Sequence, residues 1–215
     1  MKIGIIGTGV MGQSLAKAFA SENHQVMFGT RDVSKPEVIS FQSKNPTITI
    51  GTFAETAKFG ELLILTVSGD VAESAVQLAG IENFRGKTVI DTTNPIAKGK
   101  PENGVLRFFT DINFSLMEKL QQLIPDAHFV KCFNSIGNNV VYKPSYKQGP
   151  PSMFICGNNE GAKKTVADIL TVFGWEAEDM GMAEAARSIE SLCVLWCIPG
   201  FLHNQWGHAF KLLKE

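Results

Sequence analysis

Three glycines near the start of the chain have a spacing that suits the binding of a dinucleotide. Gly7, Gly9 and Gly12 follow an apolar run at residues 2–6 in the pattern G-x-G-x-x-G, and the intervening residues are Thr8, Val10 and Met11. In a strand–turn–helix unit the first glycine allows a tight turn, the second admits the pyrophosphate, and the third lets the helix pack on the strand. The pattern therefore predicts a pyrophosphate at the N-terminus of the next helix, where N–H donors are unpaired. A structural turn without a ligand is the alternative.

The end of the second predicted strand indicates which dinucleotide is bound. Residues 24–29 form that strand, and Thr30, Arg31 and Lys35 follow it. NAD-binding proteins usually carry Asp or Glu here, whereas a hydroxyl and a guanidinium suit the 2′-phosphate of NADP. We therefore expect NADP, held by these three side chains. Asp32 leaves an alternative open, because it either binds a ribose hydroxyl, if the strand is longer, or is a turn residue.

Small and polar residues also follow three further predicted strands. In parallel sheets, ligands bind outside the carboxyl ends of the strands. The candidates for contact with the nicotinamide ribose and ring amide are Val67 and Ser68, Asn94 and Pro95, and Asn134 and Ser135. Ordinary turn chemistry is the alternative for each of them, since Asn-Pro is a common turn signal.

Strand and helix patterns alternate along the chain, and they would position these residues. Apolar segments typical of buried parallel strands occur at residues 2–6, 61–67, 87–91, 128–133 and 152–156, with a shorter one at 175–179. Helical patterns at 71–79, 115–123 and 161–173 separate them. We predict an α/β fold of Rossmann type, a doubly wound and mainly parallel sheet over residues 1–180, with a small C-terminal helical extension at 181–215. The long irregular segment at 96–113 is typical of a lid or a binding loop.

The C-terminal extension is predicted to contain two helices, residues 183–197 and 201–213, separated by Pro199 and Gly200. Apolar residues recur at helical spacing in both, which we interpret as a wall of the substrate site and a homodimer surface. Plain core packing is the alternative. Cys193, Cys197, His203 and His208 make a poor zinc set because of the Pro-Gly break and their apolar neighbours, so no metal site is predicted.

Composition limits the classes of partner. The 215 residues are 44% hydrophobic and 19% charged, with a formal net charge of −1. Near-neutral charge argues against nucleic acid or an anionic membrane as a partner. We find no apolar run close to the ~18 residues of a membrane span. The strand that begins at residue two leaves no room for a signal peptide, so we expect a cytoplasmic protein with four reduced cysteines.

Longer segments of the chain resemble a known family. GIIGTGVMGQSLAKAFA, VMFGTRD, DTTNP, HFVKCFNSIG and ARSIESL together are similar to the deazaflavin (coenzyme F420)-dependent NADP oxidoreductases and to the soluble oxidoreductase domain of the six-transmembrane metalloreductases. The resemblance covers nearly the whole chain and implies NADP as cofactor. It implies 2′-phosphate contacts at Thr30, Arg31 and Lys35, and nicotinamide contacts at Val67, Asn94, Pro95 and Ser135. It also places Ser191 near the deazaflavin.

Two departures from the family concern the second substrate. The archaeal enzymes resemble His-Thr-Ile-Pro where this chain has Asn-Ser-Ile-Gly at residues 134–137, and the metalloreductases have Asn at that position, as here. Cys193 stands where the deazaflavin enzymes have Thr. We predict Asn134, Ser191 and Cys193 as acceptor-site residues and leave the identity of the acceptor and the direction of transfer open.

The resemblance implies direct hydride transfer between the nicotinamide and an acceptor ring stacked on it. That chemistry needs placement more than acid–base catalysis, so no catalytic side chain is predicted. The expected function is an NADP(H)-dependent oxidoreductase acting on a soluble flavin or deazaflavin. The alternative is a non-catalytic NADP-binding redox sensor or partner-bound subunit, in which a side chain fills the slot over the nicotinamide. The β-hydroxyacid dehydrogenases have a similar glycine pattern but resemble longer chains with a catalytic Lys.

Overall fold

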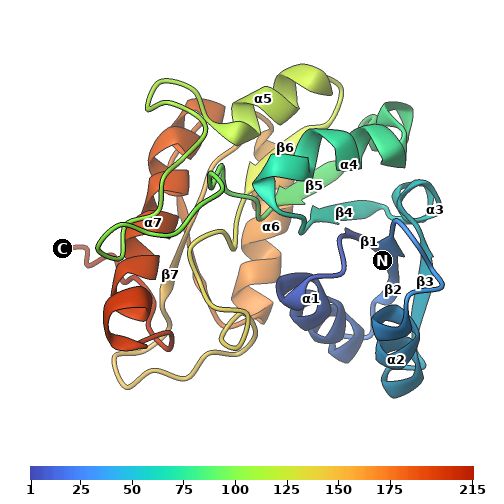
Figure 1. Cartoon of the computed structure of the whole chain (residues 1–215), viewed down its shortest axis with the longest axis horizontal. Coiled ribbons are helices and arrows are strands. Elements are labelled where there is room, and N and C mark those ends of the chain that lie inside the picture. Colours follow the sequence, from blue (N-terminus) through green and yellow to red (C-terminus); the bar gives the residue numbers. More distant parts are fainter.

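A six-stranded parallel sheet forms the centre of the molecule in the computed structural model, which describes all residues from 1 to 215 (Figure 1). Its strands are β1 (Lys2–Ile6), β2 (Gln25–Thr30), β3 (Ile48–Thr52), β4 (Leu62–Leu65), β5 (Thr88–Asp91) and β6 (His128–Lys131). The strand order is β3-β2-β1-β4-β5-β6, and every neighbouring pair is parallel. The predicted Rossmann-type fold is confirmed. The order reverses between β1 and β4, which is where such sheets bind ligands.

Helices cover both faces of this sheet, as expected for a doubly wound fold. The helices are α1 (Val10–Ser21), α2 (Pro36–Lys44), α3 (Phe53–Phe59), α4 (Ala72–Ala79), α5 (Leu116–Leu123), α6 (Glu160–Val172) and α7 (Ala186–His203). One apolar core joins the sheet to α1, α2 and α6 and contains Phe19, Phe41 and Val166. The other joins it to α3, α4, α5 and the start of α7 and contains Ala57 and Ile189. Short 3-10 turns occupy Gly69–Val71, Ile81–Phe84 and Ala183–Ala185.

The remaining strands form a separate small sheet. β7 (Ser152–Ile155) and β8 (Glu176–Asp179) pair with each other in parallel. They contact the main sheet through one antiparallel bridge, between Lys131 and Cys156. The two strands were predicted, but their separation from the main sheet was not.

Three elements were missed in the sequence, namely α2, β3 and α3. The strand β3 carries Thr49, Gly51 and Thr52 among two isoleucines, so its apolar run is too short to stand out. It forms because β2 offers a parallel edge, and Val26 pairs with Ile48 there. The helix α3 then begins at a capping box, in which Thr52 and Glu55 each bind the other's backbone N–H.

The C-terminal extension differs from the prediction in its helices. The helix α7 runs through Pro199 and Gly200 without a break and ends at His203, and Asn204 adopts a left-handed conformation with φ 53°. Residues 204–215 contain no helix and return along the molecule, where Ser152 N donates to Phe210 O at 2.9 Å. A Cβ on Gly200 would lie 2.3 Å from the Trp206 ring. The glycine therefore marks a close approach of the returning chain rather than a helix end. The division into residues 1–180 and 181–215 stays a prediction.

The same helix passes a simple test for a membrane span. An 18-residue window within Ala183–His203 has a mean hydropathy of 1.3, and 39% of that window is buried. The helix passes on its average hydropathy, whereas the expectation concerned an unbroken apolar run, and Arg187 and Glu190 interrupt the apolar residues of this helix. A core helix passes the same test, and Glu190 in this helix is buried in contacts with other elements.

Candidate active site: a groove across the strand ends

The glycine turn between β1 and α1 has the geometry that a bound pyrophosphate needs. Gly7 has φ 119°, a conformation that side chains rarely adopt, and a Cβ there would lie 2.8 Å from the Thr66 carbonyl carbon. A Cβ on Gly12 would lie 2.3 Å from Gly7 O, so the third glycine brings the helix close to the turn. Gly9 has only Thr66 O, at 4.0 Å, near its missing side chain. Neighbouring atoms therefore fill the space where side chains would lie on Gly7 and Gly12, whereas the space beside Gly9 is open.

Donors are available at this opening. Gly9 is the N-cap of α1 and provides no side-chain cap, so the first N–H groups of the helix have no side-chain acceptor. Val10 is 66% exposed even though it is apolar. Free donors at a helix N-terminus attract anions. The residues of the turn fit a pyrophosphate.

A first cavity of about 200 Å³ extends from this turn past the end of β2. Its polar lining includes Thr8, Thr30, Arg31 and Lys35, and its apolar lining includes Phe53, Val71 and Leu78. Neither Arg31 nor Lys35 takes part in any of the salt bridges of the chain, which leaves both charges available to a ligand. Two unpaired cations beside a hydroxyl suit a phosphate group.

Asp32 lies outside both this cavity and the neighbouring one. Its carboxylate accepts from the Ser34 hydroxyl at 2.6 Å and from Ser34 N at 2.9 Å, and these bonds lower the pKa of Asp32. Asp32 N in turn donates to the Thr30 hydroxyl. The strand β2 ends at Thr30, so the structure favours the turn role for Asp32 over the ribose role.

A second cavity of about 530 Å³ continues from the first across the ends of β4, β5 and β6. The two share Gly9, Thr66, Val67 and Ser68, so they form one groove. The second cavity is also lined by Val10 and Met11, by Asn94 and Asn134, by Ile96 to Gly99, and by Cys193 and Trp196. The start of the 96–113 loop therefore forms one of its walls, and Figure 1 shows this loop crossing in front of α7. The loop is held in part by a bridge between Ile96 and Phe108.

Two amides join the strand ends beneath this cavity. The Asn94 amide donates to Asn134 O at 2.8 Å, and the Asn134 amide donates to Asn94 Oδ1 at 3.0 Å. Asn134 also donates to Ile189 O, at 2.9 Å, and so contacts α7. Its own Oδ1 is buried and has no partner. The reciprocal bonds fix both amides at the floor of the groove.

A buried ionic cluster, missed in the sequence, lies at the same strand ends. Lys131 Nζ is 2.7 Å from Asp91 Oδ2 and 2.8 Å from Glu190 Oε1, and it donates to Thr93 O at 2.8 Å. Glu190 also accepts from Leu116 N and Met117 N, the first N–H groups of α5. Burial alone would lower the pKa of Lys131, but the two carboxylates outweigh this effect and raise it. A signal for this cluster was available in the sequence, because the apolar strand patterns at 87–91 and 128–133 contain the opposite charges Asp91 and Lys131. These two residues are paired in the register of β5 and β6.

Not every predicted residue faces the groove. Gly12, Pro95, Ser135 and Ser191 line neither cavity. Ser191 is exposed, and its hydroxyl donates to Arg187 O at 3.0 Å. Cys193 does line the second cavity and is 5% exposed; its hydrogen bond with Cys197 and its burial raise the pKa of its thiol. His, Cys, Asp and Glu residues do not gather anywhere in groups of three or more that suit a metal ion.

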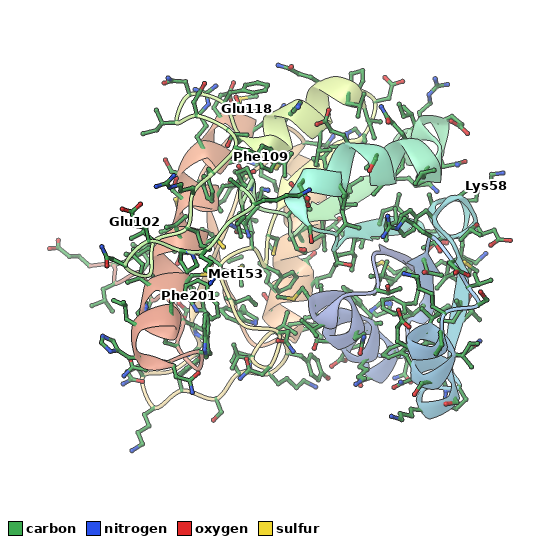
Figure 2. All side chains as sticks on the ribbon, in the orientation of Figure 1. Lys58, Glu102, Phe109, Glu118, Met153 and Phe201 are labelled. Carbon is green, nitrogen blue, oxygen red and sulfur yellow. The ribbon has the colours of Figure 1, made fainter.

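The helix that carries Cys193 is anchored to α5. Arg187 donates from Nε to Glu118 Oε2 at 3.0 Å, and Figure 2 labels Glu118 on α5. The side chain of Glu118 also closes a capping box with Ser115. Together with Glu190, these contacts position α7 against the strand ends.

Comparisons with known proteins agree with this geometry. Residues 2–95 match the family described as NADP oxidoreductase, coenzyme F420-dependent. The F420-dependent NADP reductase of Methanocaldococcus jannaschii is 27% identical over 205 residues, which are 91% of this chain and 90% of that protein. The metalloreductase STEAP3 of Rattus norvegicus is 27% identical over 206 residues, or 94% of this chain, but the chain spans only 39% of the length of STEAP3.

A solved structure extends the similarity over the whole chain. A protein from Arthrobacter sp. FB24, assigned as an F420-dependent NADP reductase, superimposes with a TM-score of 0.93 at 29% identity and covers 100% of both chains. The expected resemblance is thus confirmed: through residues 2–95 the chain matches the coenzyme F420-dependent NADP oxidoreductase family, and over its full length it is similar to proteins named as such reductases.

Proposed function

We propose that this protein is an NADP(H)-dependent oxidoreductase that transfers a hydride between the nicotinamide and a soluble flavin or deazaflavin acceptor. The family match supports the coarser statement, an NADP-dependent oxidoreductase. The observation that carries the proposal is the continuous groove, with two unpaired cations at one end and a larger cavity beside small and amide residues at the other.

The chain's own residues bind and orient the two partners. Arg31 and Lys35 hold the 2′-phosphate, and the turn at Gly9 receives the pyrophosphate. Asn94 and Asn134 lie where the nicotinamide end would reach, and their reciprocal bonds keep them from rotating. Reduced NADP supplies the hydride when bound, and the acceptor ring takes up this hydride and one proton from solvent. Placement accounts for the chemistry, so we propose no catalytic side chain.

The size of the second cavity bears on the alternative function, a non-catalytic NADP sensor or partner-bound subunit. A sensor needs space here for the nicotinamide alone, whereas this cavity of about 530 Å³ extends beyond Asn94 and Asn134, along residues 96–99 to Cys193 and Trp196. Cys193 and Trp196 line it without closing it. This space favours the enzyme.

An anaerobic assay of NADPH oxidation tests the proposal. FMN, riboflavin and a deazaflavin are each offered as acceptor, with NADH in parallel as the control donor. We expect turnover with at least one of the three, and faster with NADPH than with NADH. Tight NADPH binding without turnover of any of them would favour the sensor or partner subunit instead.

We further propose a homodimer formed through the C-terminal helix and a cytoplasmic location. The small-molecule acceptor is the expected partner, with neither nucleic acid nor membrane bound. The near-neutral formal charge of −1 supports the exclusion of nucleic acid.

A further inference from the structure

A third cavity, of about 310 Å³, opens from the second one and is used by nothing described so far. The two share Val10, Met11, Ile136 and Trp196, so they adjoin along this wall. The rest of the third cavity is lined by Gly137, Asn138, Asn139 and Trp206. The space over the nicotinamide end therefore continues past Trp196.

The aromatic wall of this third cavity is held firmly. Trp196 Nε1 donates to His208 O at 2.8 Å. The Trp196 and His208 rings are stacked, with their centroids 5.2 Å apart and an angle of 27° between their planes. Trp206 lies 5.6 Å from Trp196, tilted by 49°, and donates from Nε1 to Asn204 Oδ1. The Trp206 ring also packs closely against Gly200, which limits its movement. The wall is thus a rigid apolar surface.

The opposite side of the third cavity is polar and has unused hydrogen-bonding groups. Asn138 and Asn139 are both exposed. The Asn138 amide has one long contact, 3.5 Å to the Ser14 hydroxyl, and the Asn139 side chain takes part in no hydrogen bond. Asn139 Oδ1 folds over Gly137, where a Cβ would lie 2.5 Å from it. These amides offer donors and acceptors along one side of the cavity.

We infer that the third cavity binds the polyhydroxylated side arm of a flavin-type acceptor whose ring occupies the second cavity. The inference rests on the proposed function and names a subsite for its acceptor. The carbon chain of such an arm packs on Trp206, and its hydroxyls bond to the amides of Asn138 and Asn139. A cavity with one aromatic wall and one amide wall suits a chain that is apolar along its carbons and polar at its hydroxyls.

Two acceptors with the same ring, only one of which carries the arm, distinguish binding of the arm from binding of the ring. Riboflavin carries the hydroxylated arm, and lumiflavin carries a methyl group in its place. We expect native protein to show a KM for riboflavin about three- to tenfold below that for lumiflavin, the range that one or two hydrogen bonds contribute. If neither flavin is turned over, the corresponding deazaflavin pair is used.

The double variant Asn138→Ala, Asn139→Ala tests the assignment directly. We expect the KM for riboflavin to rise about three- to tenfold, while kcat, the KM for lumiflavin and the Kd of NADPH stay unchanged. Both residues are exposed, so the fold should persist, and thermal unfolding checks this. Asn113→Ala, at an exposed amide that lines neither of these cavities, is the control.

The outcomes separate this inference from the proposed function. Equal KM values for the two acceptors in native protein would overturn the subsite and leave the oxidoreductase intact. So would a double variant that raises both KM values alike. Absence of turnover with every flavin and deazaflavin would reject the proposed function and the subsite together.

Discussion

Arg31 and Lys35 are the cations of the first cavity, and neither has an anionic partner in the chain. Because a hydrogen bond to a charged group contributes ~1.5–3 kcal/mol, Arg31→Ala should weaken NADPH binding by about ten- to a hundredfold. The Kd of NADH should change little, since NADH lacks the 2′-phosphate. Calorimetric titration of both cofactors measures this difference.

A surface arginine provides the control for that change. Arg85 is exposed and pairs with Asp126 at 3.2 Å, outside the groove. Arg85→Ala should leave both affinities unaltered. Equal losses for NADH and NADPH in Arg31→Ala would contradict a phosphate contact at this residue.

The glycines of the turn should respond differently to the same substitution. Gly9→Val adds a side chain in open space, so the thermal midpoint should hold while NADPH binding is lost. Gly12→Val places its Cβ against Gly7 O, so stability and binding should fall together. Circular dichroism melts combined with titration distinguish the two variants. Normal NADPH binding by Gly9→Val would show that the pyrophosphate does not cross this turn.

Individual site residues could be predicted from the sequence where their position follows from a short contiguous motif. Gly7, Gly9 and Arg31 line the groove because the strand–turn–helix connection dictates their position. Ser191 was predicted from the resemblance and from its small, polar side chain, and its exposure depends on how α7 is rotated on the sheet. That rotation is set by Glu190 and Ile189, which are buried on another side of the helix. Tertiary packing of this kind leaves no local pattern.

Among the elements, β5, β6 and α7 are joined by the cluster of Lys131, Asp91 and Glu190. Lys131→Met would leave two buried carboxylates without their cation, and losses of this kind reach ~3–5 kcal/mol. We expect a decrease of that size in the free energy of unfolding, measured by urea denaturation. Lys119→Met, which breaks an exposed pair with Glu73, is the control and should cost little. Equal effects of the two substitutions would refute the structural role of the cluster.

The stability that the contact between α5 and α7 contributes should depend on pH. Burial raises the pKa of Glu118, but its bonds to Arg187 and Ser115 outweigh burial and hold the pKa below 4.5. A lowered carboxyl pKa contributes stability that is present above pH 4.5 and is lost as the pH falls through the folded-state value. Glu118→Gln should therefore lower the thermal midpoint near neutral pH and reduce its fall in acid. Glu82→Gln, on an exposed residue that takes part in no salt bridge, should leave the acid profile unchanged.

Elements with strong apolar runs or clear helical periodicity were predictable, and β4, β5, β6 and α6 lie close to their expected ranges. The exceptions depend on partners far away in the sequence. The strand β3 needs the edge of β2, and α7 continues past Pro199 because the returning chain packs Trp206 on Gly200. Local signals favoured a helix end at that Pro-Gly pair. The second predicted helix, residues 201–213, was wrong for the same reason.

On the scale of the whole molecule, α7 leaves apolar side chains uncovered. Leu195 and Leu202 are 55% and 51% exposed and lie seven residues apart, on one face of the helix. Phe109 and Phe201, labelled in Figure 2, are each 44% exposed on the loop and on α7. Exposed apolar surface of this kind is typical of an interface. It supports the proposed homodimer.

Charge placed on this face should separate the subunits. We expect native protein to sediment as a dimer and the variant Leu195→Lys, Leu202→Lys to sediment as a folded monomer. Val172→Lys introduces one lysine on α6, at a residue that is 51% exposed, and should leave the dimer intact. A native monomer, or a double variant that remains dimeric, would exclude α7 as the interface.

The two cavities of the groove are lined largely by different parts of the sequence. Residues 7–78 line the whole first cavity and fall within the 2–95 segment that matches the family. The far walls of the second cavity come from residues 96–99, 133–136 and 193–196. Under the proposed function, most dinucleotide contacts would therefore be encoded before residue 95 and most acceptor contacts after it, with Asn134 serving the nicotinamide end from the later stretch. A chimaera of two relatives joined near residue 95 would therefore keep the first cavity of one and take the far walls of the second cavity from the other, provided that the Asn94–Asn134 and Asp91–Lys131 contacts across the junction are retained.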